Sequence, residues 1–165
     1  MKKIVLILTL YILTFLIYSC KGPEGPAGPP GKDGKDGETD KQIRMELAVW
    51  NGGTEDNQWT SVLGLIKFDK RNYIGVDSII FVANIYTYDT TNFCIAELFN
   101  YDGGIVIQNS TIQSNTLYSY ISFTQSGNIY QTLPDKEINI GLRFRSSVKG
   151  KTSGIAYRYL FLYRK

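Results

Sequence analysis

Glycine occupies every third position of the chain from Gly22 to Gly37, through six consecutive triplets. Proline follows the first three of these glycines and presets an extended polyproline II backbone. A flexible glycine-rich linker has no reason to keep this register, so the periodicity is specific. We expect an extended stalk, because eighteen residues at about 3.1 Å each reach roughly 55 Å.

The triplet repeat resembles collagen, whose triple helix has room only for glycine at its axis. The resemblance implies a homotrimer in which three chains wind together. The alternative is a single-chain spacer, because ordering three short segments costs about 1–2 kcal/mol per residue. A trimeric head or a shared membrane would have to offset that cost, and both arrangements stay open.

An apolar leader precedes the repeat. Met1-Lys2-Lys3 is a short positive segment, and residues 4–18 are apolar except for Thr9 and Thr14. This run is shorter than the roughly 20 residues of a membrane span. It has the length of the apolar region of a secretory signal, and a small residue follows it.

The end of the leader resembles a bacterial lipoprotein signal, in which a cysteine at the cleavage site is acylated. Ile17, Ser19 and Cys20 match that pattern, whereas Tyr18 stands where a small residue is usual. The resemblance implies cleavage before Cys20, palmitate on that residue and a membrane anchor, since several acyl chains hold stably. The alternative is an ordinary secretory signal with a chance cysteine. Lys21 stands where an Asp would indicate inner-membrane retention in some bacteria, so we expect the outer membrane, and the stalk indicates exposure at the cell surface.

Composition excludes several classes of function. The chain has no histidine, which removes Ser-His and Cys-His nucleophile pairs and histidine-ligated metals. If Cys20 is acylated, Cys94 has no partner, and its apolar neighbours predict a small buried hydrophobe. The net charge of +3, part of it in the leader, indicates no nucleic-acid partner. We expect no cofactor.

Residues 41–165 are predicted to form one all-β domain, after a signal peptide at 1–19 and a lipidated linker at 20–40. Apolar and polar residues alternate most clearly at 138–145, where Ile138, Ile140, Leu142 and Phe144 share one face. Clusters of Gly, Asn, Asp and Ser mark turns between such runs, among them 51–53 and 126–128. We therefore expect a single antiparallel β-sandwich of about eight strands, at 42–50, 60–68, 77–88, 92–100, 104–109, 116–124, 137–146 and 154–164.

The stretch 95–164 resembles a bacterial and phage-type jelly-roll module. The resemblance rests on 96–100, 104–110, 140–143 with Ser146, and Thr152 with the strand 155–163. It implies a binding or assembly unit rather than an enzyme. The plan of a stalk followed by a jelly roll also resembles the collagen-stalked complement-type heads, which are trimers.

Aromatic residues supply the candidate ligand-binding positions. Trp50 and Trp59 flank the polar loop 51–58, and a loop tryptophan can stack on a sugar ring. The alternative is that both rings cap the end of the core. Tyrosines at strand spacing predict sheet-face packing or an oligomer contact, namely Tyr118, Tyr120, Tyr157, Tyr159 and Tyr163.

Basic residues gather at the end of the chain. Residues 136–165 contain eight basic residues and one acid, Glu137. With regular alternation, Arg143, Arg145 and Arg158 face away from the core. They are then a candidate interface with another subunit or with an anionic polysaccharide. The alternative is an ordinary solvated face, since exposed ion pairs contribute only about 0–1 kcal/mol each.

Carboxylates are scattered singly, so no pair suited to glycoside hydrolysis is recognisable. Asp69-Asn72-Asp77 or Asp89-Asn92 could supply calcium ligands, but turn geometry explains these residues equally well, and no metal site is predicted. The sequence therefore favours a non-catalytic structural or adhesive surface lipoprotein. A module that captures polysaccharide at the cell surface is the alternative.

Overall fold

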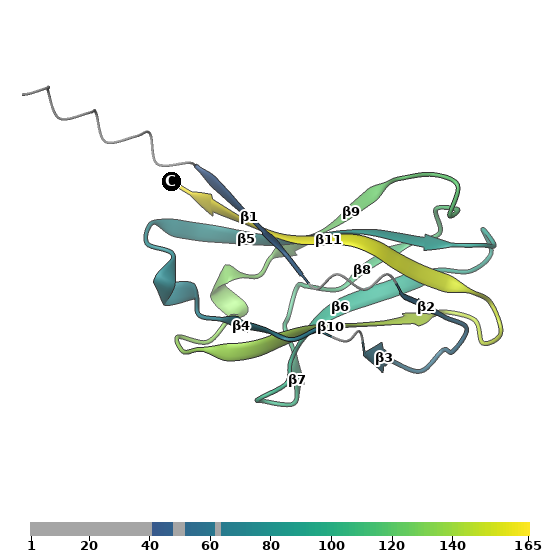
Figure 1. Ribbon diagram of the computed structural model, residues 1–165, viewed down its shortest axis with the longest axis horizontal. Helices are drawn as coiled ribbons and strands as arrows, with labels where there is room; N and C mark the ends of the chain where they lie inside the picture. The colour runs from purple at the N-terminus through teal and green to yellow at the C-terminus, as the bar shows by residue number, and fades with distance from the viewer. Residues whose placement is uncertain (1–40, 48–51, 62–63) are drawn as a thin grey trace, which may run out of the picture. The chain divides into compact units, whose positions relative to one another are not determined.

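The computed structural model describes residues 41–47, 52–61 and 64–165. The leader, Cys20, the Gly-X-Y repeat and Trp50 lie outside the described residues. The described residues form two antiparallel sheets packed face to face (Figure 1). Their strands are β1 (Gln42–Glu46), β2 (Gly52–Thr54), β3 (Thr60–Ser61), β4 (Ile66–Phe68), β5 (Val76–Thr87), β6 (Cys94–Asn100), β7 (Ile105–Val106), β8 (Ile112–Ser114), β9 (Phe123–Asn128), β10 (Ile138–Ser146) and β11 (Ser153–Arg164).

The chain crosses repeatedly between the two layers, which we call the first and second sheets. The first sheet has the order β1-β11-β5-β9, and β2 also pairs with β11. In the second sheet β10 and β6 are central; β3 and β4 pair with β10, while β7 and β8 pair with β6. Among the described residues no helix is both long enough and apolar enough to span a membrane.

This strand order is that of a jelly roll. Three strands of the described chain are each divided into two pieces that pair with the same neighbour. β1 and β2 both pair with β11, β3 and β4 both pair with β10, and β7 and β8 both pair with β6. Counted as eight, the strands have the order 1-8-3-6 in one sheet and 2-7-4-5 in the other. Such double-sheet closure leaves few open edges. The predicted all-β antiparallel sandwich is confirmed.

The core lies between the sheets and follows the predicted alternation. Ile138, Ile140, Leu142 and Phe144 of β10 are all buried, as their period of two indicates. They pack with inward-facing side chains of β5, β6 and β11 in one continuous cluster. Side chains at the alternate positions therefore form the two outer faces of the sandwich.

Three predicted elements differ from the observed ones. The predicted strand 116–124 is mostly a loop, and β9 begins only at Phe123. Gly127 was expected in a turn but lies within β9, and Gly52 and Gly53 lie in β2. Glycine and serine were taken as turn signals, whereas pairing with β5 and β11 keeps these segments extended. Local propensity was overridden by the partner strand.

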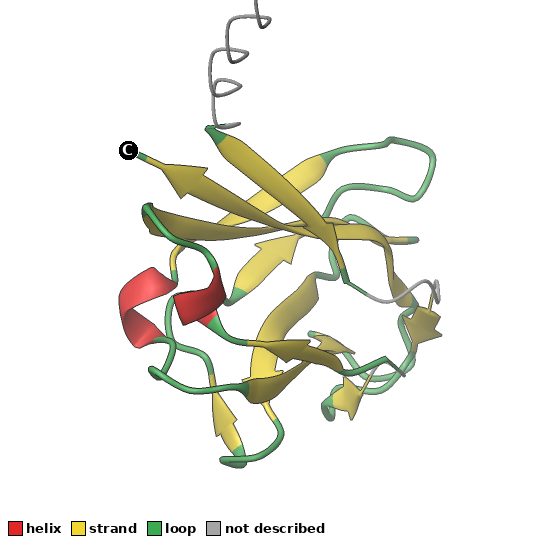
Figure 2. Ribbon diagram, turned by 60° about the vertical axis from the view of Figure 1, so that its left-hand side comes forward, coloured by secondary structure: helices red, strands yellow, loops and turns green. Residues whose placement is uncertain are grey.

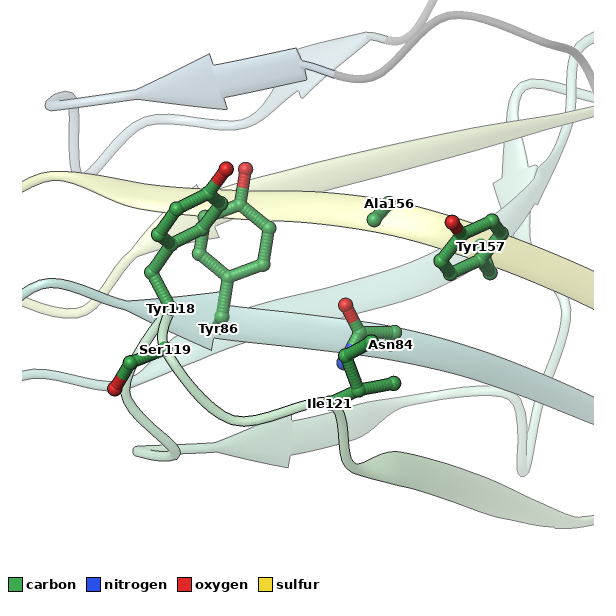
Figure 3. Close-up of a pocket in the computed structure, with 7 residues that line it drawn as sticks. All are labelled: Asn84, Tyr86, Tyr118, Ser119, Ile121, Ala156 and Tyr157. Carbon is green, nitrogen blue, oxygen red and sulfur yellow. The ribbon is translucent and has the colours of Figure 1, made fainter.

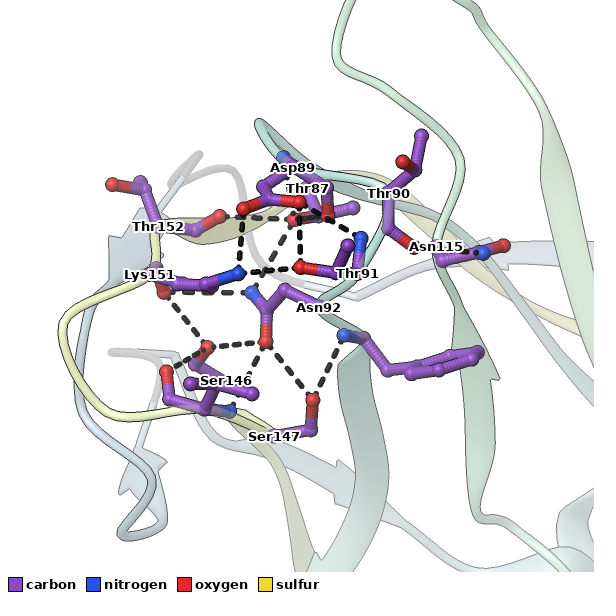
Figure 4. A network of polar contacts seen from close by, with 12 residues as sticks. Thr87, Asp89, Thr90, Thr91, Asn92, Asn115, Ser146, Ser147, Lys151 and Thr152 are labelled. Carbon is purple, nitrogen blue, oxygen red and sulfur yellow. Dashed lines mark hydrogen bonds and ion pairs between the residues drawn. The ribbon is translucent and has the colours of Figure 1, made fainter.

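Buried hydrogen bonds tie the loops together at one end of the sandwich (Figure 4). Asn92 is fully buried, and its Oδ1 accepts from the Ser147 hydroxyl at 2.9 Å and the Val148 amide at 3.1 Å. Its Nδ2 donates to the Ser153 hydroxyl at 2.9 Å. Because one side chain joins three segments, this loop end is held as a unit.

Two short 3-10 helices meet at the other end of the strands (Figure 2). They are η1 (Lys70–Asn72) and η2 (Tyr130–Thr132). The buried Lys70 ammonium donates to the Leu133 carbonyl at 2.7 Å and pairs with Asp135 at 3.0 Å. A single lysine thus ties the loop after η2 to η1.

Candidate functional site: an aromatic groove on the first sheet

The outer face of the first sheet carries two groups of aromatic rings, which we together call the aromatic face. Neighbouring strands place these rings together, because directly paired residues project on the same side of a sheet. The ring centroids of Phe123 and Tyr157 are 6.3 Å apart, and those of Tyr159 and Phe161 are 5.9 Å apart. The aromatic face consists of Tyr86, Tyr118, Phe123, Tyr157, Tyr159 and Phe161.

A β-bulge in β11 decides which side chains reach this face. Ile155 pairs with Ile85 and Arg158 pairs with Ala83, so Ala156 and Tyr157 together lie opposite one residue of β5. Such an extra residue reverses the facing of every later side chain on the strand. Tyr157 therefore points outward and is 50% exposed, while Arg158 turns inward and is 1% exposed.

The bulge forms one side of a groove of about 470 Å³ (Figure 3). Tyr86 and Tyr118 stand at one end and Tyr157 at the other, with Asn84 and Ala156 between them. The loop that follows β8 borders the groove with Ser119 and Ile121. The volume lies within the range of small-ligand sites, roughly 300–1,000 Å³.

Three tyrosines build the first end of the groove. The Tyr118 ring stacks on Tyr88 at 5.2 Å and meets the edge of Tyr86 at 4.9 Å. Tyr86 lies over Gly154 of the neighbouring strand, where a methyl group would come within 2.6 Å of the Tyr86 hydroxyl oxygen. Burial, and secondly the neighbouring Tyr88 and Tyr118, raise the pKa of Tyr86. The ring is therefore held in a fixed, partly desolvated position.

The loop that carries Tyr118 is attached at both of its ends. The Tyr118 amide donates to the Thr87 carbonyl at 2.9 Å, and the Thr87 amide donates to the Thr116 carbonyl at 2.8 Å. Farther along, Asn84 Nδ2 donates to the Ser122 carbonyl at 2.9 Å. The groove is consequently preformed, which reduces the entropy cost of binding a ligand.

Asn84 offers the groove a hydrogen-bond acceptor. Its side chain is 5% exposed, and its Nδ2 is used by Ser122. The Oδ1 atom has no hydrogen-bond partner among the described residues, and Figure 3 shows it on the side of Ala156. Asn84 Oδ1 is therefore an acceptor that opens to the groove and can receive a hydrogen bond from a ligand hydroxyl.

The candidate binding residues from the sequence lie elsewhere. Trp50 lies outside the described residues. Trp59 is partly buried on the outer face of the second sheet, where the guanidinium carbons of Arg143 and Arg145 stand 4.9 and 5.1 Å from its ring centroid. Trp59 thus packs between two arginines and neither caps the core nor lines the groove.

The prediction that Arg143, Arg145 and Arg158 all face away from the core is correct for Arg143 and Arg145 and wrong for Arg158. Arg143 and Arg145 lie on β10 in the second sheet, whereas Arg158 lies on β11 in the first. The bulge turns Arg158 inward, where it donates to the Leu47 carbonyl at 2.7 Å. Burial lowers the pKa of its guanidinium. Regular alternation was assumed for β11, and the extra residue breaks it.

Arg143 is also satisfied within the second sheet. Its guanidinium pairs with the buried Glu97 carboxylate, with Nε to Oε1 at 2.6 Å, and lies 4.2 Å from the Phe99 ring centroid. Glu97 Oε2 accepts from the Thr111 hydroxyl. This outer face is therefore internally paired rather than openly basic.

The carboxylates considered for calcium are engaged by other partners. Asp69 accepts from the Arg71 side chain at 2.6 Å, which lowers the pKa of Asp69. Asp89 pairs with Lys151 at 2.6 Å, and Asn92 is taken by the buried loop network. Within 41–47, 52–61 and 64–165, no group of three or more metal-ligating side chains comes together.

Cys94 is buried and unpaired, as its apolar neighbours predicted. Its thiol donates to the Gly154 carbonyl at 3.4 Å, directly behind the strand that bears the groove. Burial raises the pKa of this thiol to about 12. The group is a packing residue, with no thiolate available for chemistry at neutral pH.

Sequence reasoning named two of the residues that line the groove but did not predict the groove itself. Tyr118 and Tyr157 were recognised at strand spacing but were assigned to packing or oligomer contact. Ser119 and Ala156 gave no signal, because a loop and a bulge bring them to the groove. The alternation of Asn84, Tyr86 and Tyr88 along one strand was the available clue to an outward polar and aromatic row.

Comparison with known proteins adds a distant fold likeness. No protein-family model matches the chain, and no curated protein matches it either. One similar solved chain is in "Structure of infectious bursal disease virus Gx strain", with 12% sequence identity and a TM-score of 0.45. The match covers 74% of this chain and 32% of the viral chain, so it spans about a third of that protein's length.

Proposed function

We propose that this chain is a non-catalytic surface lipoprotein with an adhesive or structural head. Acyl chains on Cys20 anchor it in the outer membrane, and the Gly-X-Y repeat holds the sandwich away from the membrane. The anchor and stalk are supported by the leader that ends at Ser19-Cys20 and by the unbroken register from Gly22 to Gly37.

The observation that carries the adhesive role is the exposed aromatic face of the first sheet. Tyr157 and Phe123 are each 50% exposed, and they continue into Tyr159 and Phe161. Contiguous exposed apolar surface on a soluble domain marks an interaction site. Tyrosine is well suited to such a face because its ring is apolar and its hydroxyl can hydrogen-bond.

Cell-surface display and adhesion test this proposal. Three proteins are expressed in a Gram-negative host: the full chain, Cys20→Ser and the double variant Phe123→Ser/Tyr157→Ser. For each we measure palmitate labelling, protease accessibility on intact cells and adhesion to a coated surface. We expect Cys20→Ser to lose label and surface display. The double variant should be displayed normally and adhere poorly. Unlabelled wild-type chain, or full adhesion by the double variant, would contradict the proposal.

Sedimentation decides between the two stalk arrangements. A trimer of the full chain in detergent, together with the circular dichroism signal of a triple helix, supports the homotrimer. A monomer without that signal supports a single-chain spacer. Arg143 is already paired with Glu97 inside one head. A trimer would therefore have to be joined by other surfaces.

Glycan binding is the second candidate function, and the groove is the observation that favours it. An array of immobilised polysaccharides probed with the full chain tests it directly. Binding that disappears with Tyr157→Ala supports this second function.

A further inference from the structure

We propose that the groove between Tyr118 and Tyr157 binds one pyranose unit of a neutral polysaccharide. The inference rests on the proposed function, because it names the ligand class of the same outer face. It goes further by assigning a subsite, the polarity of its ligand and the atoms that recognise it.

The shape of the groove suits a ring-shaped ligand with one apolar face. Tyrosine rings stand at its two ends, and its volume is about 470 Å³. The axial hydrogens of a pyranose form an apolar face that can pack on an aromatic ring, while its hydroxyls stay hydrogen-bonded. Tyr157 offers such a ring, since it is half-exposed and its nearest aromatic neighbour, Phe123, is 6.3 Å away.

The lining determines the charge of the ligand. None of the described residues that line the groove is an acid or a base of the Asp, Glu, Lys or Arg type. The raised pKa of Tyr86 keeps its hydroxyl protonated. The described lining therefore offers no ammonium or guanidinium to neutralise a uronate, sulfate or phosphate group, and burying such a charge without a partner is costly. The ligand is therefore a neutral sugar.

Asn84 supplies the fixed polar contact. Its Oδ1 is open on the groove side, while its Nδ2 is bound to the Ser122 carbonyl, so the amide cannot rotate freely. A sugar hydroxyl that donates to Oδ1 replaces solvent at an acceptor of fixed direction. An apolar ring face on Tyr157 and a hydroxyl on Asn84 together fix the orientation of one sugar unit.

A second copy of this chain is the competing occupant of the aromatic face. Ile121 is 74% exposed beside the groove and would suit a protein contact. The concave shape, the open Asn84 acceptor and the uncharged polar lining favour a sugar. Protein association is therefore kept as a contrary outcome of the experiment.

The test uses the full chain purified in detergent on a broad glycan array, followed by calorimetry with the best neutral oligosaccharide. We expect binding to neutral glycans and none to polygalacturonate or sulfated dextran. Tyr157→Ala should weaken affinity about tenfold or more, because the stacking face is lost. Tyr157→Phe should retain most of the affinity.

Tyr163→Ala is the matched control, because Tyr163 is an exposed tyrosine on the same strand outside the groove. It should bind as the wild type does, and circular dichroism should show all variants folded. Three results would overturn the inference. The first is that no neutral glycan binds, and the second is that Tyr163→Ala loses as much glycan affinity as Tyr157→Ala. The third is that the aromatic face binds only a second copy of the chain and that Tyr157→Ala disrupts this self-association. Adhesion without glycan binding would leave the proposed function standing and remove only the subsite. Glycan binding without adhesion would leave the subsite standing and remove the adhesive function.

Discussion

Arg158 shows how one extra residue changes the chemistry of a strand. Its guanidinium is buried and donates to the carbonyls of Leu47 and Ala156, at 2.7 and 3.1 Å. The second of these carbonyls belongs to the bulge. Arg158 therefore supports from inside the same irregularity that presents Tyr157 outside.

Replacing Arg158 should destabilise the protein. Arg158→Met keeps much of the volume but leaves buried carbonyls without their donor, so we expect the free energy of unfolding to fall by about 2–4 kcal/mol. Urea denaturation followed by circular dichroism measures the change. Arg145→Met is the matched control, because Arg145 only stacks on Trp59 and should cost under about 1 kcal/mol. Equal stability of the two variants would show that Arg158 is not structurally required.

Cys94 should be chemically silent in the folded chain. With a pKa of about 12, its thiol stays protonated up to pH 9 and offers no thiolate to a reagent. We expect labelling by a thiol reagent to be at least about a hundredfold slower in buffer than in denaturant. Fast labelling of native protein would contradict the buried position.

At the scale of elements, the close approach of β5 and β11 depends on Gly154. A methyl group there would come within 2.6 Å of the Tyr86 hydroxyl, so Gly154→Ala should displace that ring. We expect a loss of about 1–3 kcal/mol in stability. Ultraviolet titration should show the pKa of Tyr86 falling towards its ordinary value as burial is relieved. Gly53→Ala is the control, since Gly53 pairs with Gly154 and a methyl there meets only an ordinary contact at 3.4 Å.

The stability of the fold should depend on pH through Asp89, whose carboxylate pairs with Lys151 of the loop between β10 and β11. The Lys151 ammonium, and secondly the Thr91 amide and hydroxyl, hold the pKa of Asp89 at about 2. A depressed carboxyl pKa stabilises the fold above the unfolded value of about 3.9, and this contribution disappears as pH falls towards 2. The melting-temperature difference between wild type and Asp89→Asn should therefore be present at pH 5 and much smaller at pH 2.

The elements also show what the sequence could predict. The strand at 138–146 was recognisable because β3, β4 and β6 all pair with it without a register shift, so strict alternation survives. The boundaries of β9 were missed because its pairing with β5 continues past an irregularity at Ser126 and Gly127. Neither that pairing nor the bulge at Ala156 leaves a mark in local residue preferences.

At the scale of the whole molecule, the sandwich class followed from composition and periodicity, while the groove did not. Its residues come from β5, from β11 and from the loop before β9. These segments become neighbours only through the jelly-roll strand order. A pattern read along one strand shows which residues face outward, but it does not show which outward residues meet across strands.

The pairing of β1 with β11 also has a mechanical consequence. The ladder runs from Gln42 opposite Tyr163 to Glu46 opposite Tyr159, and Tyr157 lies just beyond its far end. A tether that pulls at residue 41 and a ligand held at Tyr157 would therefore load the two strands lengthwise, from opposite ends. In this shearing geometry all rungs of the ladder bear tension at once, whereas peeling would break them one by one. A head attached in this way is suited to holding its ligand under drag from flowing liquid.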